Sequence, residues 1–119
     1  MKKILGLLML LVSLHLYAEV SDVNVQKEEV TDVRLRKGDV IVDFYGTWCM
    51  PCKMLAPIVE KVAKDKNIKL AKVDVDENEK LVREFKIMSV PTLKIFKNGV
   101  ETATLVGLTS ENKIIESIE

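Results

Sequence analysis

The stretch that most limits how this chain can fold is Val40–Tyr45, with the sequence VIVDFY. Its residues are β-branched or aromatic, and only Asp43 interrupts the apolar run. A nearly continuous apolar run of this length is typical of a strand that is buried on both faces of its sheet. Such a strand needs a packing layer on each side, so we expect helices above and below the sheet that contains it.

The rest of the chain alternates between helical and extended patterns. Cys49–Asp65 is expected to be a helix with a kink at Pro57, because its apolar residues recur every three or four positions. Ile68–Val75 alternates between polar and apolar residues over most of its length and is expected to be a strand. The other expected elements are an edge strand at Ser21–Gln26, a short helix at Lys27–Lys37, a helix at Glu77–Phe85, strands at Thr92–Phe96 and Val100–Val106 with an Asn98-Gly99 turn between them, and a helix at Ser110–Ile118. This order predicts an α/β fold with a central mixed sheet flanked by helices on both faces.

Residues 1–18 have a composition unlike the rest of the chain. Lys2 and Lys3 precede an almost wholly apolar run over residues 4–14, and the small residue Ala18 precedes the first acidic residue. This pattern is typical of a secretory signal peptide that is cleaved after the small residue. The apolar run is short for a membrane-spanning helix, which needs about 20 apolar residues, and an uncleaved anchor is the alternative. We therefore expect one domain over residues 19–119, located outside the cytoplasm in a periplasmic or secreted setting.

Both cysteines of the chain lie in the motif WCMPC, at Cys49 and Cys52. A structural zinc site needs four ligands, and the only histidine, His15, lies in the presumed signal peptide, so we expect no metal. A purely structural disulfide here would close a very short loop and would stabilise the fold little. A reversible dithiol is the better interpretation, because a helix N-terminus at Cys49 favours the thiolate and Cys52 follows one turn later.

Beyond the cysteine motif, the chain resembles the thioredoxin family from about Ser21 to the C-terminus. The resemblance rests on motifs that occur in order along the sequence: Val42-Asp43-Phe44-Tyr45, Trp48-Cys49-Met50-Pro51-Cys52-Lys53, Ala56-Pro57, Lys72-Val73-Asp74-Val75-Asp76, Val90-Pro91-Thr92, Phe96-Lys97-Asn98-Gly99 and Gly107. It implies the thioredoxin fold and a thiol–disulfide oxidoreductase that needs no cofactor. In such an enzyme Cys49 attacks a substrate disulfide and Cys52 resolves the mixed disulfide.

The resemblance also implies roles for a buried carboxylate and for the lysine that faces it. Asp43 interrupts an apolar strand, where a carboxylate is costly to bury unless it is paired or useful. In the family's pattern it lies beneath Cys52 and serves as its general base or acid, a role that a pKa raised by burial would suit. Lys72 matches a lysine that faces this carboxylate. The alternatives are that Asp43 caps the next element and that Lys72 is a solvated strand lysine.

Four further positions make up the substrate-binding part that the resemblance implies. Val90 precedes a cis bond to Pro91, and its backbone pairs with an extended substrate segment by strand addition. Trp48 is expected to be a lid beside the nucleophile, with a core aromatic residue as the alternative. Gly107 is expected to let the substrate backbone approach closely, with an ordinary glycine at a strand end as the alternative.

Two departures from the family's usual pattern bear on the function. Met50 stands where the Cys-Gly-Pro-Cys version has glycine, and Ser89 stands where glycine is common. The Met-Pro dipeptide brings no positive charge that would hold a thiolate, which favours a protein-disulfide reductase. A disulfide oxidase or isomerase is the first alternative, and a non-catalytic binding module with the same fold is the second.

The expected partners are disulfide-containing protein substrates and a protein that supplies electrons. The donor is expected to be a membrane electron-transfer protein or a thioredoxin reductase-type protein. Nucleic acid is not expected, because 18 basic and 18 acidic residues leave no basic excess for binding phosphates. We expect the protein to be a monomer.

Overall fold

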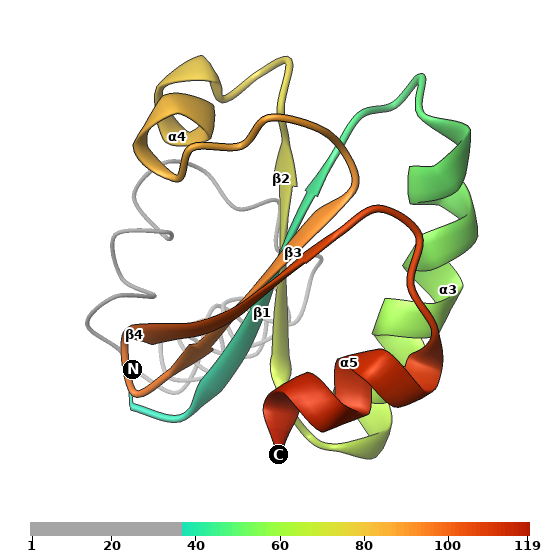
Figure 1. Cartoon of the computed structure of the whole chain (residues 1–119), viewed down its shortest axis with the longest axis vertical. Helices are drawn as coiled ribbons and strands as arrows, with labels where there is room; N and C mark the ends of the chain where they lie inside the picture. The colour runs from blue at the N-terminus through green and yellow to red at the C-terminus, as the bar shows by residue number, and fades with distance from the viewer. Residues whose placement is uncertain (1–36) are drawn as a thin grey trace, which may run out of the picture.

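The computed structural model describes residues 37–119, which form a four-stranded sheet with helices on both faces (Figure 1). The strands lie in the order β2-β1-β3-β4. In chain order the elements are β1 (Asp39–Tyr45), α3 (Met50–Asp65), β2 (Lys69–Asp74), α4 (Glu79–Glu84), β3 (Thr92–Lys97), β4 (Val100–Val106) and α5 (Glu111–Ile118). The expected signal peptide, the edge strand at 21–26 and the helix at 27–37 lie outside the described residues, apart from Lys37.

The sheet is mixed, as the order of the elements predicted. β1 lies between two partners, pairing parallel with β2 and antiparallel with β3. β3 and β4 form the antiparallel hairpin that the Asn98-Gly99 signal indicated, and both turn residues have positive φ, 51° and 81°. The register of this hairpin shifts between Ile95 and Phe96, an irregularity that the sequence pattern did not predict.

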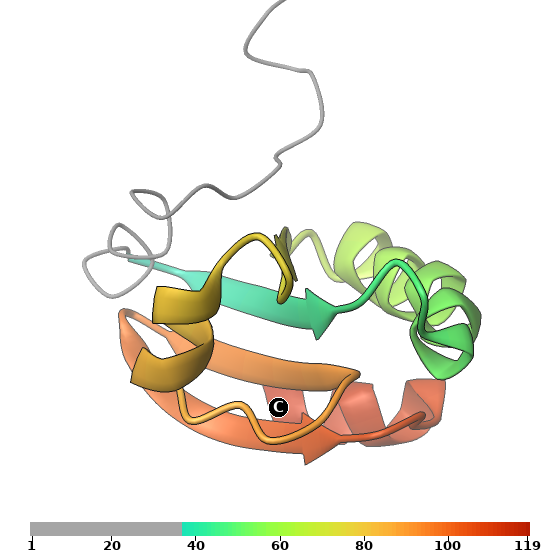
Figure 2. The same cartoon turned by 90° about the horizontal axis from the view of Figure 1, so that it is seen from above.

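Apolar side chains cover both faces of the sheet, so the central prediction drawn from the apolar strand is confirmed. α3 and α5 pack on one face and α4 packs on the other (Figure 2). The buried cluster on the α3 side consists of Ile41, Leu55, Val59, Val62, Ala63, Leu93, Ile95, Ile114 and Ile118. The buried cluster on the α4 side consists of Val40, Val42, Phe44, Ala71, Val73, Leu81, Phe85 and Phe96.

α4 is shorter than its predicted range of Glu77–Phe85 at both ends. Glu77 lies in the turn before the helix, and Asn78 takes the N-cap position without a side-chain capping bond. Lys86 has a φ of 55°, a left-handed conformation that ends a helix. The apolar spacing of Leu81, Val82 and Phe85 indicated the helix, whereas its ends depend on backbone conformations that the spacing does not encode.

Strand alternation decides which side of the sheet each β1 residue faces. Ile41 belongs to the cluster under α3, and Asp43, two residues on, therefore points to the same side. The chain leaves β1 at Tyr45 and reaches the N-terminus of α3 after a short loop that contains Cys49. β1 thus carries a carboxylate beneath the start of the helix that follows it.

The opposite end of β1 is joined to the hairpin turn by two hydrogen bonds. The backbone N–H of Asn98 donates to the carbonyl of Gly38 at 3.0 Å, and the N–H of Gly38 donates to Asn98 Oδ1 at 2.8 Å. These bonds fix the point at which the chain enters the sheet. Within residues 37–119, none of the helices is long and apolar enough to cross a membrane.

Candidate active site

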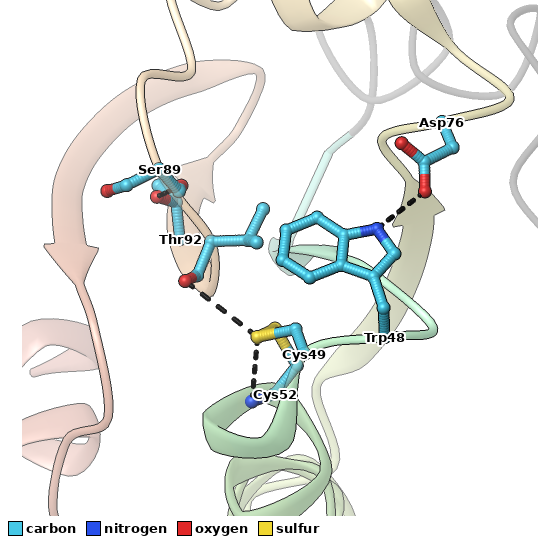
Figure 3. Close-up of a disulfide and its surroundings, with 7 residues drawn as sticks. Trp48, Cys49, Cys52, Asp76, Ser89 and Thr92 are labelled. Carbon is cyan, nitrogen blue, oxygen red and sulfur yellow. Dashed lines mark hydrogen bonds between the residues drawn. A yellow bond between two sulfur atoms is a disulfide. The ribbon is translucent and has the colours of Figure 1, made fainter.

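Cys49 and Cys52 form a disulfide at the N-terminus of α3 (Figure 3). Cys49 is the N-cap residue, and its Sγ accepts a hydrogen bond from the backbone N–H of Cys52 at 3.2 Å. The helix begins at Met50, one residue later than predicted, because Cys49 takes the extended backbone of a cap. A thiolate formed at Cys49 would receive this N–H bond and lie at the positive end of the helix dipole, and both favour the thiolate form.

The segment before β3 lies directly against Cys49. The carbonyl oxygen of Val90 is 3.9 Å from Cys49 Sγ, and the Val90–Pro91 bond is cis, the isomer that the resemblance implies. Two bonds fix this segment: the Thr92 hydroxyl donates to the carbonyl of Ser89 at 2.7 Å, and the N–H of Gly107 donates to the carbonyl of Pro91 at 2.8 Å. The backbone of Val90 is thereby held beside the sulfur that would attack a substrate.

The backbone conformation of Gly107 is the next feature of this part of the site. Its φ is +86°, and a Cβ added to it would meet no atom of this chain within 4 Å. The positive φ strongly favours glycine here, because residues with a side chain rarely adopt it. Space for a substrate backbone above Gly107 remains a prediction.

Trp48 lies beside the disulfide and is 66% exposed, so it is not a core residue (Figure 3). Its Nε1 donates a hydrogen bond to Asp76 Oδ2 at 2.7 Å. A Cβ at position 46 would lie 2.8 Å from the indole ring, so Gly46 is needed for the ring to occupy this position. Sequence reasoning missed both supporting residues, although Asp76 belongs to a motif it had singled out and Gly46 stands two positions before the tryptophan.

Asp43 is only 2% exposed, and its Oδ1 has no hydrogen-bond partner. Burial raises the pKa of its carboxyl from 3.8 to about 6, while the positive charge of Lys72 lowers it and the negative charge of Glu60 raises it. The residue lies in the middle of β1, paired with Lys72 on one side and Leu93 on the other, and not at a strand end where it could cap the next element. A carboxyl with this pKa can take up and release a proton near neutral pH.

Lys72 faces Asp43 across the parallel pair of β1 and β2, but its ammonium is bound elsewhere. Its Nζ lies 3.6 Å from Glu60 Oε1 on α3 and 5.2 Å from the centre of the Tyr45 ring. The Glu60 side chain is 57% exposed, and exposed ion pairs of this kind contribute at most about 1 kcal/mol. Lys72 is therefore neither a fully solvated lysine nor a bonded partner of Asp43.

A pocket of about 280 Å³ opens beside Asp43. Its walls are mainly apolar, and it reaches both the second cysteine and the lysine on β2. The lining residues are Asp43, Tyr45, Gly46, Thr47, Cys52, Lys53, Ala56 and Lys72. The Asp43 carboxyl, Cys52 and Lys72 thus share one space, as the resemblance implies.

Large apolar side chains are exposed around the disulfide. Of the seven such residues that are exposed in the described part of the chain, six lie within two positions in sequence of Cys49, Cys52, Val90 or Gly107, and only Val100 lies at the distant hairpin turn. The six are Trp48, Met50, Met54, Met88, Val106 and Leu108. A protein surface rarely gathers exposed apolar residues at one end without a binding role. In residues 37–119, no group of three histidine, cysteine, aspartate or glutamate side chains is placed to hold a metal ion.

A mixed sheet between helices, with a disulfide of a CxxC motif at a helix N-terminus and a cis-proline beside it, defines a protein of the thioredoxin-fold class. The thioredoxin family model matches residues 19–119, and the chain belongs to the thioredoxin family.

Curated relatives and a solved structure agree with this family. The thioredoxin of Rickettsia bellii is 44% identical over 81 residues, which cover 66% of this chain and 77% of the relative. The thioredoxin of Staphylococcus saprophyticus is 42% identical over 90 residues, which cover 74% and 86% of the two chains. A mutant thioredoxin from Halobacterium salinarum superposes with a TM-score of 0.74 at 40% identity, over 82% of this chain and 85% of the other. The expected fold is confirmed, and the chemistry of the family is thiol–disulfide exchange with disulfide substrates and a reductase-type electron donor.

Proposed function

We propose that this protein is an extracytoplasmic protein-disulfide reductase. The observation that carries the proposal is the position of Cys49 Sγ, which receives the Cys52 N–H at the start of α3 and lies against the Val90 carbonyl. An extended substrate segment that pairs with the Val90 backbone would bring its disulfide to this sulfur. The exposed apolar residues around the disulfide suit unfolded or partly unfolded substrates that expose apolar segments.

The reaction proceeds in two exchanges. The Cys49 thiolate attacks one sulfur of the substrate disulfide, forms a mixed disulfide and releases the first substrate thiolate, which takes up a proton. Asp43 then accepts the proton of the Cys52 thiol. The Cys52 thiolate attacks Cys49 Sγ, forms the Cys49–Cys52 disulfide and releases the second substrate thiolate. The substrate gains two electrons and the protein loses two, so a donor must restore the dithiol after each turnover.

Residues 1–18 support the extracytoplasmic setting, because they combine two lysines, a short apolar run and Ala18 in the order of a signal peptide. Outside the cytoplasm, a membrane electron-transfer protein is the donor that this setting favours. The Met50-Pro51 dipeptide supports the reductase direction, since it places no positive charge between the cysteines to stabilise the reduced form.

A Cys52→Ser variant tests the assigned roles. Without the resolving thiol, Cys49 should remain joined to its substrate, so the variant should accumulate mixed disulfides that gel electrophoresis detects without reductant and that reductant releases. The Cys49→Ser variant is the matched control and should trap nothing. If Cys52→Ser traps no substrate while the wild type remains active, the roles of the two cysteines are wrongly assigned.

The reduction potential of the Cys49–Cys52 pair, measured against a defined thiol buffer, tests the direction of the reaction. A potential near that of cytosolic thioredoxins, about −270 mV, would support a reductase, and one near about −120 mV would indicate an oxidase. Absence of any reversible couple would leave only a non-catalytic binding module.

A further inference from the structure

Lys72 has two carboxylate neighbours that could pair with its ammonium. Asp43 stands directly opposite it in the register of β1 and β2, and Glu60 approaches it from α3. In the structure its ammonium lies 3.6 Å from Glu60 and over the Tyr45 ring, while Asp43 Oδ1 has no partner. The buried carboxylate is therefore left without the cation that its own strand neighbour could supply.

We propose that Glu60 is a positioning residue, which holds the Lys72 ammonium away from Asp43 and so keeps the Asp43 carboxyl free to exchange a proton with Cys52. This inference rests on the proposed role of Asp43 in the reaction. Glu60 would touch neither the substrate nor the two sulfurs, and it would act only through Lys72.

Few other charged groups near Asp43 could hold the Lys72 ammonium or pair with the Asp43 carboxyl. Leu93, its partner on β3, is apolar, and the α5 residues that pack on this face are the apolar Ile114 and Ile118. On α3, Lys53 also lines the pocket, and on β1 the phenol of Tyr45 lines it. Lys72 and Glu60 act on the pKa of the Asp43 carboxyl by charge in opposite directions: Lys72 lowers it and Glu60 raises it.

The physical consequence depends on where the ammonium sits. If Lys72 were hydrogen-bonded to Asp43, the ionised carboxylate would be stabilised and would be a poor acceptor for the Cys52 proton. With Lys72 held by Glu60, the carboxyl keeps a pKa of about 6. Both side chains are partly exposed, so the ion pair can open and close as the charge on Asp43 changes.

The test is the titration of Asp43 in the oxidised protein without substrate, followed by NMR of its side-chain carboxyl carbon. In Glu60→Gln, Lys72 is released to pair with Asp43, so the titration midpoint should fall by about one pH unit. Glu116→Gln removes the same charge from the exposed side of α5 and should leave the midpoint unchanged. Glu60→Asp, which keeps the charge, should restore most of the wild-type value.

A second background separates positioning from a direct effect of the Glu60 charge. In Lys72→Met there is no ammonium to redirect, so adding Glu60→Gln should lower the midpoint much less than in the wild-type background, by only the direct effect of the Glu60 charge. An equal shift in both backgrounds would show that Glu60 acts through space and would overturn the proposal, as would no shift in Glu60→Gln alone. Because this measurement involves no turnover, its result is independent of whether Asp43 serves Cys52, which the activity of Asp43→Asn decides.

Discussion

Two charged side chains are buried in adjacent central strands, and they differ in almost every other respect. Asp43 on β1 is 2% exposed and Lys94 on β3 is 8% exposed. Lys94 donates to Glu101 and to Thr104 Oγ1, the latter at 3.1 Å, and Thr104 also donates to Glu101 at 3.2 Å. Asp43 Oδ1 has no partner at all.

The difference between the two residues separates a structural charge from a reactive one. A buried charge with hydrogen-bonded partners ties its neighbours together, and Lys94 joins β3 to β4 in this way. A buried charge without partners costs stability, and such sites are found where chemistry needs a shifted pKa. Asp43 lies in the same pocket as Cys52, whereas Lys94 alternates with Leu93 and Ile95 and so faces the other side of the sheet.

The largest expected effect is that of Asp43→Asn, which should remove function and add stability together. Single-turnover resolution, followed by the fluorescence of the only tryptophan, should slow by about 100-fold or more, because the base for Cys52 is lost. The wild-type rate should fall as the pH drops through about 6, and the variant should lack this inflection. A variant with the wild-type rate and pH profile would remove Asp43 from the reaction.

The stability of the same variant follows from the raised pKa. The folded protein keeps the Asp43 proton up to about pH 6, whereas the unfolded chain loses it near 3.8, so wild-type stability falls as the pH rises between these values. Urea unfolding at about pH 7 should show the Asp43→Asn variant to be more stable than the wild type by roughly 3 kcal/mol, and the gain should vanish below about pH 4. A gain that does not depend on pH would point to a cause other than the charge.

A smaller effect of opposite sign is expected for Glu101→Gln. It leaves the Lys94 ammonium, whose side chain is 10% exposed, without its counter-ion. Because the glutamate side chain is 42% exposed, we expect a loss of roughly 2 kcal/mol, less than for a fully buried pair. Turnover should not change, and urea unfolding beside an activity assay measures both. If Glu101→Gln were as stable as the wild type, Glu101 would not stabilise the buried Lys94 ammonium, and the contrast with Asp43 would be wrong.

The smallest of these effects is expected for Thr104→Val, which keeps the shape of the side chain and removes one acceptor of Lys94. We expect a loss of about 1 kcal/mol in the free energy of unfolding, the usual worth of one hydrogen bond. Thr102→Val is the matched control on the same strand, since the Thr102 hydroxyl donates to the backbone carbonyl of Ile95 and not to this group. The control loses its own hydrogen bond but leaves the partners of Lys94 intact, and a Thr104→Val variant as stable as the wild type would contradict the role given to the Lys94 cluster.

The fold could be predicted from the sequence because its elements have clear patterns. The apolar run of β1, the polar–apolar alternation over most of β2 and the Asn98-Gly99 turn are local signals. Within residues 37–119, such signals predicted the right elements in the right order. The ends of α4 and the register shift in the hairpin were missed, since they depend on the backbone conformations of single residues.

The site could be predicted only in part, for a physical reason. Cys49 and Cys52 stand out because both cysteines of the chain lie in one short motif. Asp43 stands out because it places a carboxylate in an apolar strand. Glu60 looks like any exposed charge on the solvent side of an amphipathic helix, and its pairing with Lys72 appears only when α3 is laid over β2. Gly46 gives no signal until the indole beside it is placed.

The two hydrogen bonds between Gly38 and Asn98, here called the clasp, fix the end of the sheet at which β1 begins. β1 runs from this clasp to the disulfide end, and its seven residues span roughly 20 Å. Lys37, where the described part of the chain begins, therefore lies at the end of β1 away from the sulfurs. A support attached to the described domain at this end would leave the approach to Cys49 unobstructed.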